Sequence, residues 1–146
     1  KMVDNLRTKV AFITFGTVVY MIWSVIVVAA QDILSGTSLP TTIVLFAQVL
    51  PYFIVTFLFP FFIQKCSYWI KICFLCPVFV GGIMLIGLSS QVKWKLIGVA
   101  VSSVASGAAE STFVPLTAKY REESVSAYFT GSGIGFVAAP LYYSGE

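Results

Sequence analysis

One acidic residue stands inside a long apolar stretch, and this position makes it the first candidate for chemistry. Glu110 lies within residues 102–113, whose other members are all uncharged. A charged carboxylate at the centre of a membrane helix costs about 2.5 to 3.5 kcal/mol, so such a residue normally faces a bundle interior or a wet cavity. An acid in that setting can bind and release a proton, or accept hydrogen bonds from a solute.

Small and hydroxyl-bearing residues share the helical face of Glu110. Ser103, Ser106 and Gly107 precede it at helical spacings of three and four residues. A face of this kind lets another helix or a solute approach closely. Two interpretations stay open. These residues line a path for a solute or a proton, or they form a packing seam in which hydroxyls or a distant basic group hold Glu110.

A second group of small and polar residues lies at positions 128–135. It looks like a phosphate-binding glycine loop, but no strand precedes it and the lysine of a P-loop is missing. Gly131 and Gly135 form a small-x-x-x-small pair, which predicts a tight helix crossing. Thr130 and Ser132 could hydrogen-bond across this crossing, or they could contribute to a substrate cavity.

Three further residues complete the set of candidates. Asp32 follows the first apolar stretch and is either a solvated loop charge or a residue at the mouth of a cavity. Gln48 lies in the second apolar stretch, three residues before Pro51. Pro51 removes a backbone hydrogen bond and therefore predicts a kink, which either only helps packing or contributes to motion.

The residue types that are absent exclude several kinds of chemistry. The chain has no histidine, so a histidine base and a His-ligated metal are excluded for it. Cys73 and Cys76 have thioredoxin-like spacing, but their apolar surroundings predict ordinary helix packing. Glu110 has no partner acid or credible nucleophile with which to form a general acid and base pair. We therefore expect no enzymatic activity, no metal site and no cofactor.

The elements that must position these residues are membrane-spanning helices. Of the 146 residues, 58% are hydrophobic and 10% are charged, whereas a soluble domain carries about 25% charged residues. The mean hydropathy is +0.93. A chain of this length has too small an interior to bury so much apolar surface, so lipid must cover it. We expect an all-α polytopic transmembrane bundle.

Five apolar runs of roughly membrane-spanning length predict a partial bundle of about five helices. They cover residues 10–30, 41–63, 70–88, 96–118 and 126–143. The first run is longer than the core of a signal peptide usually is. The connections between the runs are short, so consecutive helices should be antiparallel neighbours.

The positions of lysine and arginine predict how this bundle is oriented. One side of the membrane would hold seven basic residues, Lys1, Arg7, Lys9, Lys65, Lys71, Lys119 and Arg121, and the other only Lys93 and Lys95. By the positive-inside rule the N-terminus is then cytosolic. The net charge of +3 is spread by topology rather than gathered into a patch, so we do not expect nucleic acid as a partner.

Four stretches in order resemble the battenin family of lysosomal membrane proteins. They are residues 29–34 (AAQDIL), 45–51 (LFAQVLP) with Pro60 after them, 106–113 (SGAAESTF) and 126–135. The resemblance implies part of the N-terminal half of a fold like that of the major facilitator superfamily, in a lysosomal or vacuolar membrane. Glu110 matches the acidic position that the family has in the third stretch.

The resemblance also implies a function. Battenins are associated with lysosomal homeostasis, including luminal pH, and with export of glycerophosphodiesters. We therefore expect a transporter half that moves a small polar or anionic solute, in contact with membrane lipid and with the remaining helices of a longer protein. The chain begins with Lys1 and stops directly after an apolar run, so we expect it to be a piece of a longer protein. The resemblance implies that this piece comes from the N-terminal part. The alternative is a non-transporting membrane scaffold or trafficking protein.

Two positions depart from the family pattern. Gln48 stands where the family commonly has an acidic residue, and Thr56 stands where a lysine often follows. Losing an acid and a base together keeps the membrane charge balanced. The resemblance therefore implies a divergent member or altered selectivity.

Overall fold

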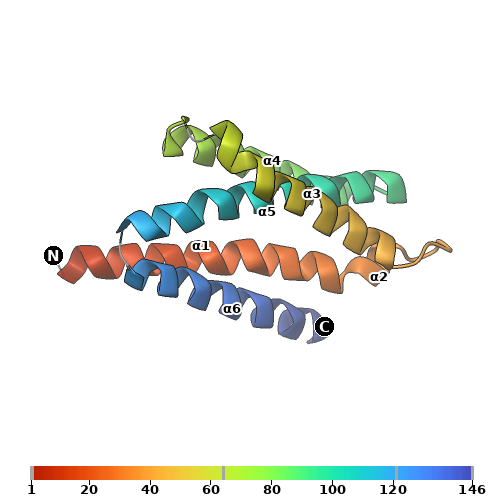
Figure 1. Cartoon of the computed structure of the whole chain (residues 1–146). Coiled ribbons are helices and arrows are strands. Elements are labelled where there is room, and N and C mark those ends of the chain that lie inside the picture. Colours follow the sequence, from red (N-terminus) through yellow and green to blue (C-terminus); the bar gives the residue numbers. More distant parts are fainter. Residues whose placement is uncertain (1, 64, 121, 146) are drawn as a thin grey trace. The chain divides into compact units, whose positions relative to one another are not determined.

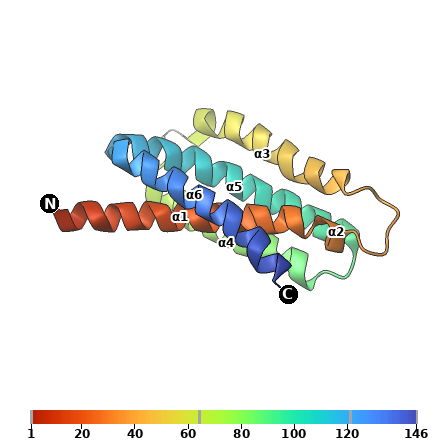
Figure 2. The same ribbon diagram turned by 90° about the horizontal axis from the view of Figure 1, so that it is seen from below.

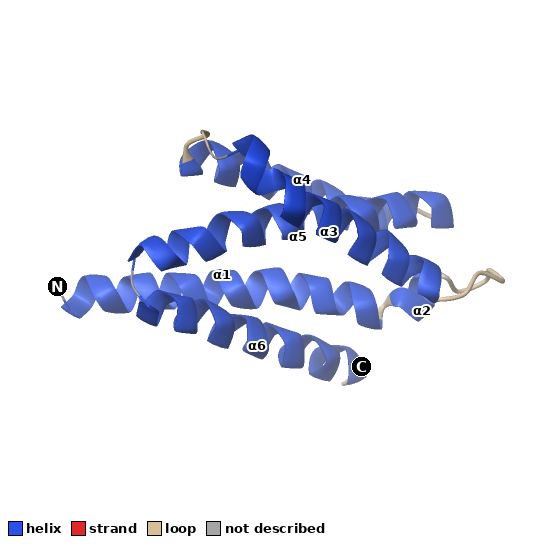
Figure 3. Ribbon diagram, viewed as in Figure 1, coloured by secondary structure: helices blue, strands red, loops and turns tan. Residues whose placement is uncertain are grey.

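The computed structural model describes residues 2–63, 65–120 and 122–145, which form six helices and no strands (Figures 1 and 3). Five are long: α1 (Met2–Val28), α3 (Thr42–Ile63), α4 (Tyr68–Leu88), α5 (Val92–Tyr120) and α6 (Glu122–Ser144). The helix α2 (Ala30–Ile33) is a single short turn. This architecture confirms the predicted all-helical fold class.

Among the described residues, four helices are long and apolar enough to cross a membrane. These candidate spans are Val3–Val28, Thr42–Phe62, Tyr68–Leu88 and Val92–Lys119. Large apolar side chains are exposed on them, as a surface in contact with lipid requires. The helix α6 has 23 residues, but its glycines and hydroxyl-bearing residues lower its hydropathy. Its role as a fifth span therefore stays a prediction.

The helices extend beyond the apolar runs that predicted them. The helix α1 begins at Met2 rather than at residue 10. The helix α5 begins at Val92 rather than at residue 96, and α6 begins at Glu122 rather than at residue 126. Hydropathy marks the part of a helix that lies in lipid, whereas polar residues at its ends continue the same backbone hydrogen bonding. The connection expected at 31–40 also begins inside α2, so Asp32 belongs to a helical turn and not to a loop.

The helices α1 and α6 lie side by side in the first of two compact units, Lys1–Val28 with Phe113–Glu146 (Figures 1 and 2). Residue numbers rise together along their contact, so the two helices are parallel. Thr17 Oγ1 lies 3.0 Å from the Gly131 carbonyl oxygen. Further along, Ser24 Oγ lies 3.3 Å from the Phe136 carbonyl oxygen.

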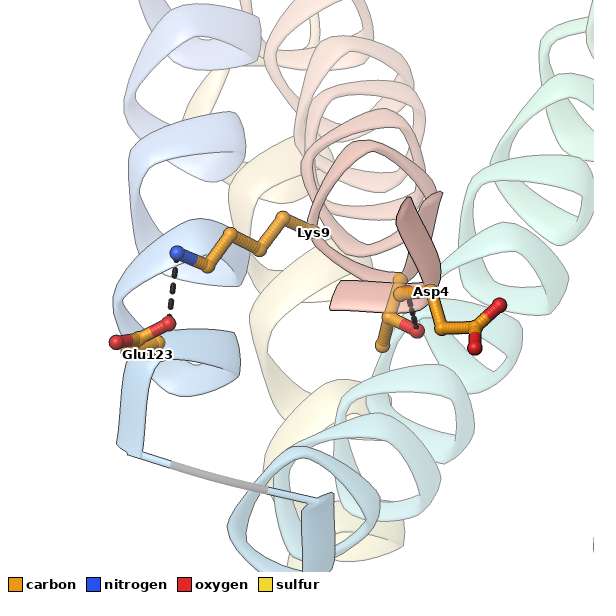
Figure 4. Close-up of polar contacts among 4 residues, drawn as sticks. Asp4, Lys9 and Glu123 are labelled. Atoms are coloured by element: carbon orange, nitrogen blue, oxygen red, sulfur yellow. Dashed lines mark hydrogen bonds and ion pairs between the residues drawn. The ribbon is translucent and has the colours of Figure 1, made fainter. Parts of the chain in front are cut away.

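An ion pair closes one end of this α1–α6 contact. Lys9 Nζ lies 2.7 Å from Glu123 Oε2, and both side chains are partly exposed (Figure 4). The pair brings together one basic residue from the predicted cytosolic N-terminal segment and one acid from the first turn of α6. Lys1 and Arg121, two other charges behind the orientation prediction, lie outside the described residues.

The second unit, Ala29–Thr112, contains α3, α4 and most of α5. Glycines bring its helices close together. A Cβ at Gly98 of α5 would lie 2.9 Å from the Gly82 carbonyl oxygen of α4, and a Cβ at Gly107 would lie 3.0 Å from the Tyr52 carbonyl oxygen of α3. Small residues are the usual means by which membrane helices pack, because they let backbones approach.

Candidate functional site

The polar face predicted around Glu110 is buried on α5. The least apolar of the four candidate spans is also the most buried: more than half of it lies inside the protein, whereas the spans on α3 and α4 are mostly exposed. Ser103 and Ser106 are buried and Glu110 is half-buried. The sequence thus places its polar residues on the helix that protein, rather than lipid, covers, which avoids the cost of exposing them to hydrocarbon.

Tyr52 of α3 donates a hydrogen bond from its phenolic hydroxyl to Oε2 of Glu110. Hydrogen bonds to a carboxylate are stronger than those between neutral groups, and a low dielectric strengthens them further. The contact therefore offsets part of the cost of keeping an acid in a membrane helix.

The sequence prediction did not include Tyr52. A signal for it was present, because Gln48, Tyr52 and Thr56 follow one another at spacings of four and so share one face of a helix. Gln48 is fully buried. The three polar residues form a stripe on α3, a helix that is otherwise rich in phenylalanine and aliphatic residues. Tyr52 and Thr56 of this stripe lie next to Gly107 of α5.

Gly107 marks a close approach between α3 and α5 at this site. A Cβ there would lie 3.0 Å from the Tyr52 carbonyl oxygen and 3.2 Å from Thr56 Oγ1. Gly107 precedes Glu110 by one helical turn, so the close approach and the Tyr52–Glu110 hydrogen bond belong to the same contact. Within the described part of the chain, the buried hydroxyl of Thr56 has no hydrogen-bond partner.

The serines of the α5 face bond to their own helix. Ser103 Oγ donates to the carbonyl oxygen of Val99 at 2.8 Å, and Ser106 Oγ donates to that of Ser102 at 3.0 Å. This is the local back-bonding that hydroxyls adopt inside helices. Because a hydroxyl carries one proton, neither serine donates to Glu110 in this conformation, and the hydroxyl that does so comes from Tyr52.

Gly131 and Gly135 lie against α1, in the first unit. A Cβ at Gly131 would overlap the Ile13 carbonyl oxygen, and one at Gly135 would overlap that of Thr17. Gly16 of α1 faces them in the same way, since its Cβ would overlap the Tyr128 carbonyl oxygen. The two helices thus meet through glycine on both sides.

The expected hydrogen bonds from Thr130 and Ser132 across this crossing are not what the structure shows. Thr130 is exposed and donates to the carbonyl oxygen four residues earlier at 2.8 Å, whereas Ser132 donates to the one three residues earlier at 2.7 Å. Back-bonding satisfies both hydroxyls within α6. The hydroxyls that lie near carbonyl oxygens across the crossing belong to Thr17 and Ser24 of α1, and Thr17 Oγ1 also bonds back to the Ile13 carbonyl oxygen at 2.8 Å.

The remaining candidates lie on α2, α3 and α4. Asp32 is exposed on α2, and its backbone carbonyl accepts a hydrogen bond from Ser35 Oγ at 2.8 Å. Pro51 lies inside α3, which continues as a helix on both sides of it. The kink at Pro51 stays a prediction. Cys73 and Cys76 are free thiols and are exposed on α4.

Comparison with known proteins gives a consistent result along nearly the whole chain. The family model described as "CLN3 protein" matches residues 10–145. Protein BTN1 of Yarrowia lipolytica is 38% identical over 133 residues, which are 90% of this chain and 33% of that protein. Protein BTN1 of Candida albicans is 35% identical over 133 residues, or 89% of this chain and 31% of the relative.

A third relative extends the match further. Protein BTN1 of Chaetomium globosum is 34% identical over 142 residues, which cover 94% of this chain and 31% of that protein. The chain therefore spans about a third of the length of these curated relatives. No solved structure matches it significantly. The family model covers the Glu110 stretch, the α3 stripe and the glycines of α6, and with its membrane-spanning helices this chain belongs to the CLN3 (battenin) family of membrane proteins.

Proposed function

We propose that this chain is part of a secondary transporter of the lysosomal or vacuolar membrane, which exports a small polar or anionic solute of the glycerophosphodiester type. The role is non-enzymatic, and the partners are membrane lipid, the solute and further helices of a longer protein. The single observation that supports this proposal most is the half-buried Glu110, which accepts a hydrogen bond from Tyr52 inside a pair of span-length helices.

The energetic cost of Glu110 favours a functional role. An acid at the centre of a membrane helix costs about 2.5 to 3.5 kcal/mol, and glutamine would fill nearly the same space at a lower cost. Membrane proteins therefore rarely keep such an acid unless it handles a proton, an ion or a solute. Ser103, Ser106 and Gly107 lie on the same buried face of α5 and are the further candidates for lining its path.

Transport by alternating access needs two bundles that move about a central site near the midplane of the membrane. The helices of this chain would supply part of one bundle. With the N-terminus in the cytosol, Asp32 and the connection between α4 and α5 lie on the luminal side, while the connection between α3 and α4 lies in the cytosol.

The proposal can be tested in a hybrid protein, in which this chain replaces the matched part of Protein BTN1 of Yarrowia lipolytica. The hybrid is expressed in cells that lack their own BTN1, and release of labelled glycerophosphodiesters from isolated vacuoles is measured. Unmodified BTN1 serves as the positive control. We expect the hybrid to restore export, and Glu110→Gln to reduce it at least about tenfold at equal abundance, the factor that about 1.4 kcal/mol represents.

The matched control is Glu122→Gln, which changes an exposed acid in the first turn of α6 and should leave export unchanged. Equal export by the Glu110→Gln hybrid would make Glu110 structural. If the hybrid restores no export although BTN1 does, the proposed transport role is wrong. Unchanged export together with altered recovery of partner proteins from Glu110→Gln membranes would favour the scaffold alternative.

A further inference from the structure

The contact between α3 and α5 joins two features that are usually separate: a charged group and a point of close backbone approach. Tyr52 takes part in both. Its hydroxyl donates to Glu110 Oε2, and its carbonyl oxygen lies 3.0 Å from the position that a Cβ of Gly107 would occupy. The hydroxyl of Tyr52 thus contacts the carboxylate, and its backbone lies at the close approach of the two helices.

We propose that Tyr52 is a positioning residue for Glu110, and that the absent side chain of Gly107 sets the helix spacing at which the Tyr52–Glu110 hydrogen bond can form. This inference rests on the proposed function, and it deepens it by stating how the acid is held in the solute path. Tyr52 acts through Glu110 and need not touch the solute.

The geometry explains why a tyrosine suits this position. A tyrosine side chain has a rigid ring and few rotatable bonds, so it holds its hydroxyl at a fixed reach from the backbone at a low cost in conformational entropy. The fixed reach places a limit on the spacing between the helices. If α3 moved away from α5 by the few tenths of an ångström that a methyl group at Gly107 requires, the hydroxyl would move away from the carboxylate with it.

Pro51 weakens the backbone hydrogen bonding of α3 directly before Tyr52. It has no N–H group to donate to the carbonyl of residue 47, one turn earlier, so the helix lacks one of its own hydrogen bonds directly before Tyr52. The contact with Gly107 and Glu110 would then fix a segment of α3 that is less constrained by its own backbone. The hydrogen bond to Glu110 thus orders the helix as well as the acid.

The first experiment is a double-mutant cycle in the hybrid, with Tyr52→Phe, Glu110→Gln and both changes together. Initial export rates are measured over a range of solute concentrations, and thermal unfolding of the detergent-solubilised hybrids is measured in parallel. We expect Tyr52→Phe to raise the KM for export about tenfold or more at unchanged abundance, because a hydrogen bond to a charged group is lost. In the Glu110→Gln background, Tyr52→Phe should lower the unfolding midpoint much less than in the parent.

The second experiment compares two glycine-to-alanine changes in the same unit. Gly107→Ala adds a methyl group at the close approach and should raise the KM in the same direction as Tyr52→Phe. Gly87→Ala on α4 adds a methyl group with no atom within 4 Å and should leave the KM unchanged. Gly82→Ala serves as a destabilising control, because its Cβ would overlap the hydroxyl of Ser102, eight residues before Glu110. It should lower the unfolding midpoint without raising the KM.

The outcomes separate this inference from the proposed function. If the unaltered hybrid exports solute but Tyr52→Phe leaves the KM within twofold, Tyr52 is not a positioning residue and the proposed function stands. If the midpoint shifts of Tyr52→Phe and Glu110→Gln are additive, the two residues act independently, and the inference is again wrong. If the unaltered hybrid exports nothing, the proposed function and this inference are both contradicted.

Discussion

At the residue scale, the acid is recognisable in the sequence by itself, whereas its partner is marked only by the polar spacing of Gln48, Tyr52 and Thr56. Glu110 stands out because a charge in an apolar run is costly. Tyr52 does not, because a tyrosine among phenylalanines fits an apolar helix without any polar partner. Which hydroxyl reaches Glu110 depends on how α3 rotates and crosses α5, and Tyr52 and Glu110 are more than fifty residues apart in sequence.

The ion pair between Lys9 and Glu123 leads to a prediction of a small effect. The two side chains are 40% and 57% exposed, and such pairs contribute about 0.2 to 1 kcal/mol because water and salt screen them. We expect Lys9→Gln to lower the free energy of unfolding by no more than this, and less at high salt. Thermal unfolding in detergent at two salt concentrations measures it. A larger loss in the free energy of unfolding, unchanged by salt, would contradict this prediction and indicate that the pair lies in a region of low dielectric.

At the scale of elements, the glycines of α6 were recognisable as a packing motif, but the helix that they contact was not. Gly131 and Gly135 lie against α1, whose residues are more than a hundred positions earlier. Gly16 on that helix completes the contact, yet a lone glycine in an apolar run carries little information by itself. The hydroxyls of Thr130 and Ser132 bond to carbonyl oxygens of their own helix, α6. The hydroxyls that lie near carbonyl oxygens across the contact are those of Thr17 and Ser24 on α1.

This packing predicts a sharp difference between neighbouring glycines of α6. Gly131→Ala should lower the free energy of unfolding by about 1 to 3 kcal/mol, as overpacking of a tight contact does, because its Cβ would overlap backbone atoms of Ile13. Gly133→Ala meets no atom within 4 Å and should be neutral or slightly stabilising. Thermal unfolding of the two variants decides the matter, and equal midpoints would contradict the parallel α1–α6 contact.

At the scale of the whole molecule, composition alone was sufficient for the fold class, because so short a chain cannot bury so many apolar residues in water. The boundaries of the helices were less predictable, since hydropathy reports lipid contact and not backbone hydrogen bonding. The short helix α2 carries little apolar periodicity and was not predicted. Family membership agrees with the four stretches on which the resemblance was based.

The predicted orientation can be tested by labelling with a maleimide that does not cross membranes. In the hybrid with Cys73 and Cys76 changed to serine, and with cysteines outside this chain also replaced, Cys66 should be labelled in intact vacuoles. A cysteine introduced at Ser90, between α4 and α5, should be labelled only after the membrane is opened. The reverse pattern would contradict a cytosolic N-terminus.

The central claim is that Glu110 belongs to the path of a solute, and uptake by purified protein tests it most directly. The hybrid and its Glu110→Gln variant are reconstituted into liposomes at equal amounts, and entry of a radiolabelled glycerophosphodiester is followed against time. We predict saturable uptake by the hybrid and a loss of about tenfold or more in the variant, the factor that about 1.4 kcal/mol represents. Equal, saturable uptake by both proteins would contradict the claim and make Glu110 a structural residue.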